Sequence, residues 1–377
     1  MTITKRSLPK NWHWTKLIDV CEIIMGQSPP GNTYRKTPEG MPFFQGKADF
    51  GERHPIARTW CIAPSRIAKP GDILLSVRAP VGPTNIADVE SCIGRGLAAI
   101  RSTEKADRDF VLFALKFYEN DLVKKGSGST FDAIRKEDLF NLEIPLPPLD
   151  EQKRIAAHLD ELMRHSERAR QAVEEQLSLI TYLVNSYFRE SLQRKTTKMH
   201  LSDCMVEVKK GVGETWAQYP VLGATRSGVA PAKEKVGKQP QRYKLVEPGT
   251  IFYNPMRIMI GSIAMLDDGD ESGITSPDYV VLKGKEGILH PRWFYYWFRS
   301  PYGENFIKSL ARGAVRERML FNRLDKGEIE LPDWKTQVKI AEKLKEIKTF
   351  KQALEAQLAE INELPSALLR QAFAGQL

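Results

Sequence analysis

Cysteine and histidine are scarce in this sequence. Its 377 residues include 4 cysteines and 6 histidines, and no two cysteines form a Cys-x-x-Cys pair. A disulfide framework or a zinc ribbon needs paired, closely spaced ligands, so neither is indicated. The four cysteines, Cys21, Cys61, Cys92 and Cys204, are therefore expected to be reduced and buried.

Long hydrophobic runs are absent as well. No stretch approaches the roughly 20 apolar residues that span a membrane. The first ten residues carry three basic side chains, but no apolar segment follows them, unlike a secretory signal. We therefore expect a cytoplasmic protein without a membrane partner.

Motifs for catalysis are incomplete. Gly40–Lys47 resembles a phosphate-binding loop, but five residues separate its glycines instead of four, and no Ser or Thr follows the lysine. Asn254–Arg257 lacks the second proline and the aromatic residue of the adenine methyltransferase motif Asn-Pro-Pro-aromatic. Val281 stands where a nuclease metal site would need an acid. We expect no catalytic residue, metal or cofactor in this chain.

The charge that is present is positive. The chain has 56 Lys and Arg against 47 Asp and Glu, a net charge of +9. This balance favours a polyanionic partner such as nucleic acid. Because no basic tail concentrates the excess, the cations must be spread over folded surfaces.

An internal repeat organises the chain. The segment Ile144–Pro147 is echoed by Ile329–Pro332, and the same shift in numbering relates Gln152 to Gln337 and Gly26 to Gly211. Between these anchors the shift is smaller, since Pro-Gly at 70–71 matches Pro-Gly at 248–249. Compensating insertions indicate a fixed scaffold with variable loops, which is where recognition usually resides.

Each copy ends in a long amphipathic segment with two heptad rows. At about 45 residues, or about 65 Å, such a helix outreaches a small domain, so the two are expected to pair antiparallel. Pro365 should kink or restart the second helix, and the equivalent Ser166 and Lys351 should interrupt the seam. The rows are Ile155, Leu162, Ala169, Gln176, Leu183 and Leu159, Ser166, Val173, Ile180, Tyr187, then Ile340, Ile347, Leu354, Ile361, Leu368 and Leu344, Lys351, Leu358.

The segments before each long helix are rich in strand patterns. Residues 72–77, 250–253 and 279–282 predict strands after turn residues, and 110–118 and 293–298 predict buried helices. The fold class is therefore α+β, with two strand-rich domains alternating with two long helices as a pseudo-twofold repeat. The expected boundaries are 1–147, 148–196, 197–332 and 333–377.

Polar and basic residues in glycine- and serine-containing loops are the candidate nucleic-acid ligands. They recur in corresponding parts of the two copies. We expect them to contact phosphate groups in preference to base edges. In the first copy they are Gln27, Ser28, Arg35, Lys36, Gln45, Lys47, Arg78 and, in the loop 124–130, Lys124, Lys125 and Ser127. In the second they are Lys209, Lys210, Thr225, Arg226, Asn254, Arg257, Arg312 and Arg316.

Three segments together resemble the specificity subunit of type I restriction-modification systems. They are Ile144–Pro148 followed by Glu151–Ile155, the closing Ala367–Leu377, and Pro70–Leu74. The resemblance covers the whole chain and implies two target-recognition domains alternating with two conserved helices. The entry to the second helix departs from it, with Asp333-Trp334 in place of Pro148-Leu149.

The resemblance implies a DNA-recognition role without catalysis. Each domain would read one half of a bipartite, asymmetric target on double-stranded DNA, and the coiled coil would set the spacer. Two methyltransferase subunits, carrying S-adenosylmethionine and methylating adenine, would dock on the helices near Leu149, Ile155 and Phe188. Motor-nuclease subunits would supply ATP- and Mg²⁺-dependent steps.

Three other interpretations are open. A self-contained methyltransferase or nuclease is disfavoured by the incomplete motifs. A coiled-coil scaffold without sequence readout is disfavoured by the two strand-rich domains that fill most of the chain. An orphan or phase-variable specificity subunit of a related methyltransferase system would keep the fold and change the partners.

Overall fold

A computed structural model describes residues 8–126, 133–193, 195–233, 236–311 and 318–377. The chain divides into two compact units, Met1–Ala172 with Leu358–Leu377, and Val173–Gln357. Each unit contains one globular domain and parts of both long helices. Within the described residues, no helix is both long and apolar enough to cross a membrane.

The core sheet of the first domain is antiparallel, in the order β2-β10-β7-β8. Strand β7 is buried at every position, as expected for an apolar run inside a sheet. Helix α2 follows β10, and its first turn is capped by Asp107, which accepts a hydrogen bond from the Phe110 amide at 2.9 Å. The four strands are β2 (Cys21–Met25), β10 (Leu97–Ser102), β7 (Ile73–Ser76) and β8 (Thr84–Ile86).

The second domain has a core sheet of the same order, β13-β20-β17-β18, also antiparallel. The predicted strands at 72–77, 250–253 and 279–282 correspond to β7, β17 and β20, so these predictions are confirmed. The four strands are β13 (Met205–Glu207), β20 (Val280–Gly284), β17 (Thr250–Tyr253) and β18 (Ile263–Met265).

The elements that flank the core sheets also correspond. A strand pair closes each domain, β1 with β11 and β12 with β21, and the buried helices expected at 110–118 and 293–298 are α2 and α7. Short helices α1 and α6 occupy equivalent places, each directly before the first strand of its core sheet. The bounds are β1 (His13–Lys16), β11 (Glu143–Leu146), β12 (Thr196–His200), β21 (Glu328–Pro332), α1 (Leu17–Val20), α6 (Leu201–Cys204), α2 (Arg108–Phe117), α7 (Pro291–Phe298), α3 (Glu119–Gly126), α8 (Pro301–Leu310), α4 (Lys136–Phe140) and α9 (Phe321–Leu324).

The two domains differ in their peripheral sheets. The first has a five-stranded sheet, β3-β5-β4-β9-β6, whereas the second has two antiparallel strand pairs, β14-β15 and β16-β19. The internal repeat is therefore a constant core with a variable periphery. The bounds are β3 (Tyr34–Arg35), β5 (Trp60–Cys61), β4 (Met41–Phe44), β9 (Ser91–Ile93), β6 (Ile67–Ala68), β14 (Leu222–Thr225), β15 (Gly228–Pro231), β16 (Lys244–Val246) and β19 (Gly273–Thr275). Short 3-10 turns are η1 (Gly31–Thr33), η2 (Lys47–Asp49), η3 (Gly213–Gln218), η4 (Pro240–Arg242) and η5 (Ile258–Ile260).

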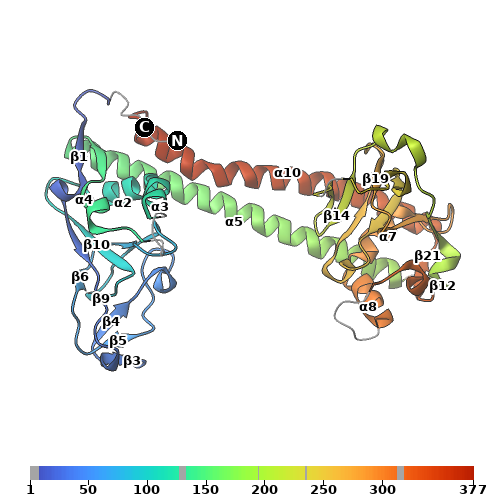
Figure 1. Cartoon of the computed structure of the whole chain (residues 1–377), viewed down its shortest axis with the longest axis horizontal. Helices are drawn as coiled ribbons and strands as arrows, with labels where there is room; N and C mark the ends of the chain where they lie inside the picture. The colour runs from blue at the N-terminus through green and yellow to red at the C-terminus, as the bar shows by residue number, and fades with distance from the viewer. Residues whose placement is uncertain (1–7, 127–132, 194, 234–235, 312–317) are drawn as a thin grey trace. The chain divides into compact units, whose positions relative to one another are not determined.

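The long helices are α5 (Leu149–Gln193) and α10 (Trp334–Ala372), and they pair antiparallel (Figure 1). In the first unit, the beginning of α5 shares a core with the end of α10, through Leu159 and Leu369. In the second unit, Phe188 near the end of α5 shares a core with Leu344 near the start of α10. The predicted pair of long helices is confirmed.

The buried seam differs from the predicted one. Helix α5 buries its second heptad row, including Val173 and Ile180, whereas α10 buries its first, including Leu354 and Ile361. Ser166 is buried, but the Lys351 side chain is half exposed and pairs with Glu355 at 3.5 Å, so a shared polar interruption is wrong. On α10 the heptad row that contains Lys351 faces outward at this position, so this long side chain reaches solvent. Helix α10 continues through Pro365 without restarting.

Candidate nucleic-acid interface

A polar pocket of about 250 Å³ lies in the first domain, beside the loop that joins β7 to β8. The loop contributes Arg78, and the segment after β4 contributes Gln45 and Lys47. Ser28, after β2, and Arg95, between β9 and β10, complete the polar lining. The structure therefore brings together four of the predicted ligands, and it adds Arg95.

Hydrogen bonds and close backbone contacts fix the walls of this pocket. The Ser76 hydroxyl donates to the carbonyl oxygens of Arg78 at 3.1 Å and Pro80 at 2.9 Å. The Gln45 amide donates to the Asp49 carboxylate at 2.7 Å. A Cβ atom at Gly96 would lie 2.2 Å from the Gln45 carbonyl oxygen, so only glycine permits this packing. The cations are thus carried by an ordered backbone.

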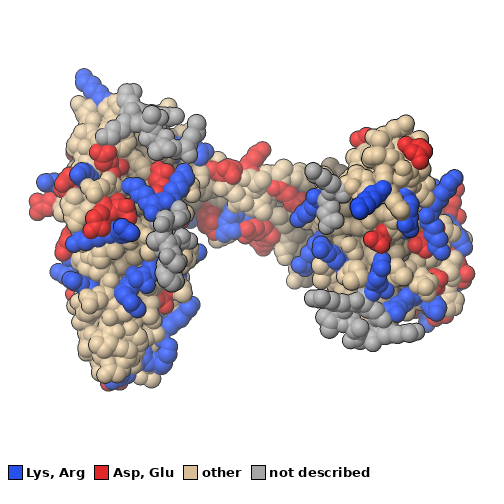
Figure 2. Space-filling view, viewed as in Figure 1, with Lys and Arg blue, Asp and Glu red and all other residues tan. Residues whose placement is uncertain are grey.

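The cations of this pocket are available to a partner. Lys47, Arg78 and Arg95 are exposed, and among the described residues none has a carboxylate within ion-pair distance. Figure 2 shows Lys and Arg side chains scattered over this face of both domains rather than gathered in one patch. Unpaired cations on fixed loops suit phosphate groups.

The other first-domain candidates lie outside this pocket. Gln27 is exposed next to Ser28, and Lys36 is exposed after β3. Arg35 is held by its neighbours, donating to the Asn32 and Tyr34 carbonyl oxygens and pairing with Glu39 at 3.4 Å.

The predicted glycine loop at 124–130 is partly wrong. Lys124 and Lys125 are exposed on the last turn of helix α3. Acidic residues in the first turn and these lysines in the last complement the helix dipole, so the helix extends to Gly126. Ser127 lies outside the described residues.

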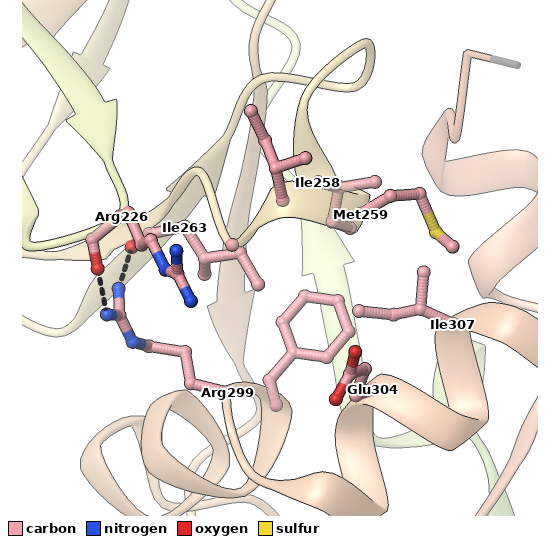
Figure 3. A pocket seen from close by; sticks show the side chains of 10 residues that line it. Arg226, Ile258, Met259, Ile263, Arg299, Glu304 and Ile307 are labelled. Atoms are coloured by element: carbon pink, nitrogen blue, oxygen red, sulfur yellow. Dashed lines mark hydrogen bonds between the residues drawn. The ribbon is translucent and has the colours of Figure 1, made fainter. Parts of the chain in front are cut away.

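The second domain contains a larger pocket, of about 400 Å³ (Figure 3). Arg226, in the turn between β14 and β15, stands on one side, and the β17–β18 loop with Met259 forms another. Helices α7 and α8 supply the remaining wall, with Phe298, Ile307 and Glu304. The lining combines apolar side chains with the charged Arg226, Arg299 and Glu304.

Arg299 ties the parts of this pocket together. It follows α7, and its guanidinium donates to the Ile263 carbonyl oxygen at 2.6 Å and to the Arg226 carbonyl oxygen (Figure 3). It also lies over the Tyr295 ring, 5.2 Å from the centroid. Because its donors are used within the domain, Arg299 positions the turn that carries Arg226.

The remaining second-domain candidates are dispersed. Lys209 pairs with Glu207 at 3.5 Å, and Lys210 is exposed. The Thr225 hydroxyl donates to the Gly228 carbonyl oxygen, so it closes the β14–β15 turn. Arg312 and Arg316 lie outside the described residues.

Asn254 and Arg257 belong to the β17–β18 loop. The Asn254 side-chain oxygen accepts a hydrogen bond from the Met256 amide at 2.9 Å, so it stabilises the loop locally. Arg257 is exposed. This loop corresponds to the β7–β8 loop of the first domain, which carries Arg78.

Comparison with known proteins assigns the chain to a family. The profile of the family described as Type I restriction modification DNA specificity domain matches residues 9–176 and 218–364, which together make up most of the chain. The chain belongs to this family. Its two matched segments each contain most of one of the two core sheets, so the specificity domain occurs twice.

Relatives described as type I restriction enzyme specificity subunits match parts of the chain. The MjaX specificity subunit of Methanocaldococcus jannaschii is 44% identical over 173 residues, covering 44% of this chain and 41% of the relative. The EcoKI specificity subunit of Escherichia coli is 21% identical over 292 residues, covering 69% of this chain and 63% of the relative. The chain thus spans less than two thirds of either relative.

A solved structure shares the fold over the full length. The S subunit of a type I restriction-modification system from M. genitalium matches with a TM-score of 0.56 and 16% identity, covering 98% of each chain. At this identity the likeness concerns the fold alone.

In both specificity domains the pocket lies at the same junction. Each pocket includes the loop between two corresponding core strands, where that loop meets the variable periphery. The loop is β7–β8, with Arg78, in the first domain and β17–β18, with Met259, in the second. Sequence reasoning missed Arg95 and Arg299, although Arg95 has the signal of glycines on both sides. The apolar Met259 and Ile260 carry no polar or charged signal in the sequence, and their exposure appears only in the fold.

The described part of the chain offers little to nucleophilic or metal chemistry. It contains no cluster of three His, Cys, Asp or Glu that could hold a metal ion. All four cysteines are free and buried, as expected. Burial raises the pKa of the Cys21 thiol to about 12 and that of Cys204 to about 11, so both are protonated at neutral pH.

Proposed function

We propose that this chain is the DNA-recognition subunit of a type I restriction-modification complex. One observation carries the proposal: two specificity domains share one core topology, and each presents a pocket edged by cations at the same junction. Each domain binds one half of a bipartite target on double-stranded DNA. The different peripheral sheets make the two halves different in sequence.

The long helices set the spacing between the two half-targets. Two recognition domains joined by a stiff connection must contact DNA at a fixed separation. In dimeric repressors, likewise, the spacing of the two half-sites follows the symmetry of the protein. Helices α5 and α10 each have an end in both units, so they are the natural spacer.

Two methyltransferase subunits dock on the paired helices. In the second unit, α5 and α10 form an apolar groove of about 640 Å³ in which Leu179 and Phe350 are more than half exposed. Leu364, the counterpart of Leu179 in the internal repeat, is also exposed, which suits two docking sites related by the repeat. Ile155 and Phe188, expected as anchors, are buried in the domain cores, so their proposed role in docking is wrong.

Catalysis belongs to the partners in this proposal. The methyltransferase subunits bind S-adenosylmethionine and flip the adenine, and motor-nuclease subunits use ATP and Mg²⁺. This chain binds none of these cofactors and acts in the cytoplasm, where the DNA is.

The test is methylation mapping of a genome. Co-expression with the matching methyltransferase subunit should produce adenine methylation at a split motif, which disappears when this chain is omitted. Exchanging residues 1–147 for those of a relative should change one half of the motif and leave the other. Methylation at unsplit sites, or none that depends on this chain, would refute the proposal.

A further inference from the structure

The β17–β18 loop exposes large apolar side chains. Ile260 is 68% exposed, Met256 51% and Met259 46%, whereas Ile258 between them is buried at 2%. Exposed apolar side chains this close together are uncommon on a soluble surface and mark a contact site.

The loop is ordered, so the exposure is a fixed feature. The amide of Arg257 donates to the Asn254 carbonyl oxygen at 3.0 Å, and the amide of Ser262 donates to the Arg257 carbonyl oxygen at 3.2 Å. The Met319 amide donates to the Pro255 carbonyl oxygen at 3.0 Å, which anchors the loop to a distant segment. Ile258 fastens the loop to the domain core.

The charges around the loop suit DNA. Arg257 lies in the loop itself, and Arg226 lines the same pocket as Met259 and Ile260. Among the described residues, neither arginine has a carboxylate within ion-pair distance. The acid at the pocket, Glu304, is paired with Lys308 at 2.9 Å. A polyanion is therefore a better partner for this surface than an acidic or neutral protein.

We propose that Met259 and Ile260 recognise thymine through its 5-methyl group in the major groove. The Ile260 side chain cannot hydrogen-bond to a base edge and the Met259 sulfur is only a weak acceptor, whereas thymine is the base that presents an apolar group there. Contact would remove the exposed apolar surface from water, while Arg226 and Arg257 bind the flanking phosphates. The inference rests on the proposed function and names what the second domain reads.

The test removes single methyl groups from the DNA. Once methylation mapping has given the motif, the half-target is assigned to the second domain by exchanging residues 197–332. Deoxyuridine then replaces each thymidine of that half in turn, and binding of the assembled methyltransferase complex is measured. At one or two positions, affinity should fall about fourfold, the value of one buried methyl group.

Protein variants supply the second arm of the test. In Ile260→Ala and Met259→Ala the loss caused by deoxyuridine should shrink toward none, because the contact is already gone. Val206→Ala is the matched control: Val206 is 47% exposed on β13, outside the loop, and the loss should remain. Both loop residues are exposed, so the variants should fold normally.

The outcomes separate this inference from the proposed function. An unchanged affinity with every deoxyuridine overturns the inference while the split motif stands. A deoxyuridine effect that survives unchanged in both loop variants also overturns it. Loss of complex assembly in these variants with DNA affinity intact would show that the loop contacts a protein instead. Absence of any split motif refutes the proposed function itself.

Discussion

Gln152 and Gln337 make the same three hydrogen bonds in the two halves of the chain. The Gln152 side chain accepts from the Asp107 amide at 2.8 Å and donates to the carbonyl oxygens of Lys105 and Pro147. Gln337 accepts from the His290 amide at 2.9 Å and donates to the carbonyl oxygens of Ile288 and Pro332. Both side chains are buried, so each joins a long helix to the start of α2 or α7.

Removing either glutamine should destabilise its own unit. Gln152→Ala or Gln337→Ala leaves buried backbone groups without partners, and the expected loss is about 2–3 kcal/mol in the free energy of unfolding. Urea denaturation measures the loss, and hydrogen exchange locates it. Gln352→Ala, at an exposed position of α10, is the control and should change little. Equal losses of stability at all three positions would contradict the role of Gln152 and Gln337 in joining each long helix to its domain.

Asp267 should hold the second domain to α10. Its carboxylate binds the buried Arg292 and also Lys348 of α10 at 3.0 Å. Arg292 also pairs with the exposed Asp268 at 2.8 Å, so Asp267→Asn removes its buried partner but not every compensating charge, and we expect a loss of about 3 kcal/mol. Thermal unfolding of the variant measures it. Glu271→Gln, at a nearby exposed carboxylate, is the comparison and should cost less than half as much.

The same carboxylate makes stability depend on acid pH. Burial raises the pKa of Asp267, but hydrogen bonds and charges from Arg292 and Lys348 outweigh it, so the folded pKa lies below the usual 3.8. A lowered folded pKa stabilises the protein above the unfolded pKa, and this contribution is lost as the pH falls through the folded value. The free energy of unfolding, measured below pH 4, should therefore depend less on pH in Asp267→Asn than in the unchanged protein. The same pH dependence in both proteins would contradict this.

The first-domain cations should contribute to the salt dependence of DNA binding. Arg78→Ala or Arg95→Ala removes one phosphate contact, so the slope of log K against log salt should become shallower by about 0.9. Fluorescence anisotropy with the assembled complex gives the slope. Arg35→Ala is the control, because Arg35 is held by Glu39 and lies outside the pocket. A slope that changes only in Arg35→Ala would show instead that the phosphate contact lies near β3.

The helix groove should be needed for complex assembly. Leu179→Glu or Phe350→Glu places a charge on an exposed apolar surface, so the chain should fold while the methyltransferase subunit fails to co-purify. Ile62→Glu, which exposes a charge on a first-domain loop, should leave assembly unchanged. Normal stoichiometry in both groove variants would exclude the groove as the docking site.

The repeat, the long helices and the core strands could be predicted, because each follows from a local pattern of residues. A heptad spacing or an apolar run between turn residues needs no distant partner to be recognised. Gln152 and Gln337 stood out as a repeated pair, but their hydrogen bonds depend on segments that precede α2 and α7. Their role in joining each long helix to its domain is therefore visible only in the structure.

Which surfaces are exposed depends on contacts between segments that lie far apart in the sequence, so the heptads and loops could not show it. The heptads did not say that α5 buries the row of Val173 while α10 buries the row of Leu354, since both rows of each helix are mostly apolar in sequence. Arg78 and Arg95 lie on separate loops and meet only because β7 and β10 are neighbours in the sheet. Ile258 and Ile260 are the same residue type in one loop, yet one is buried and the other exposed, because burial is set by what packs above the loop.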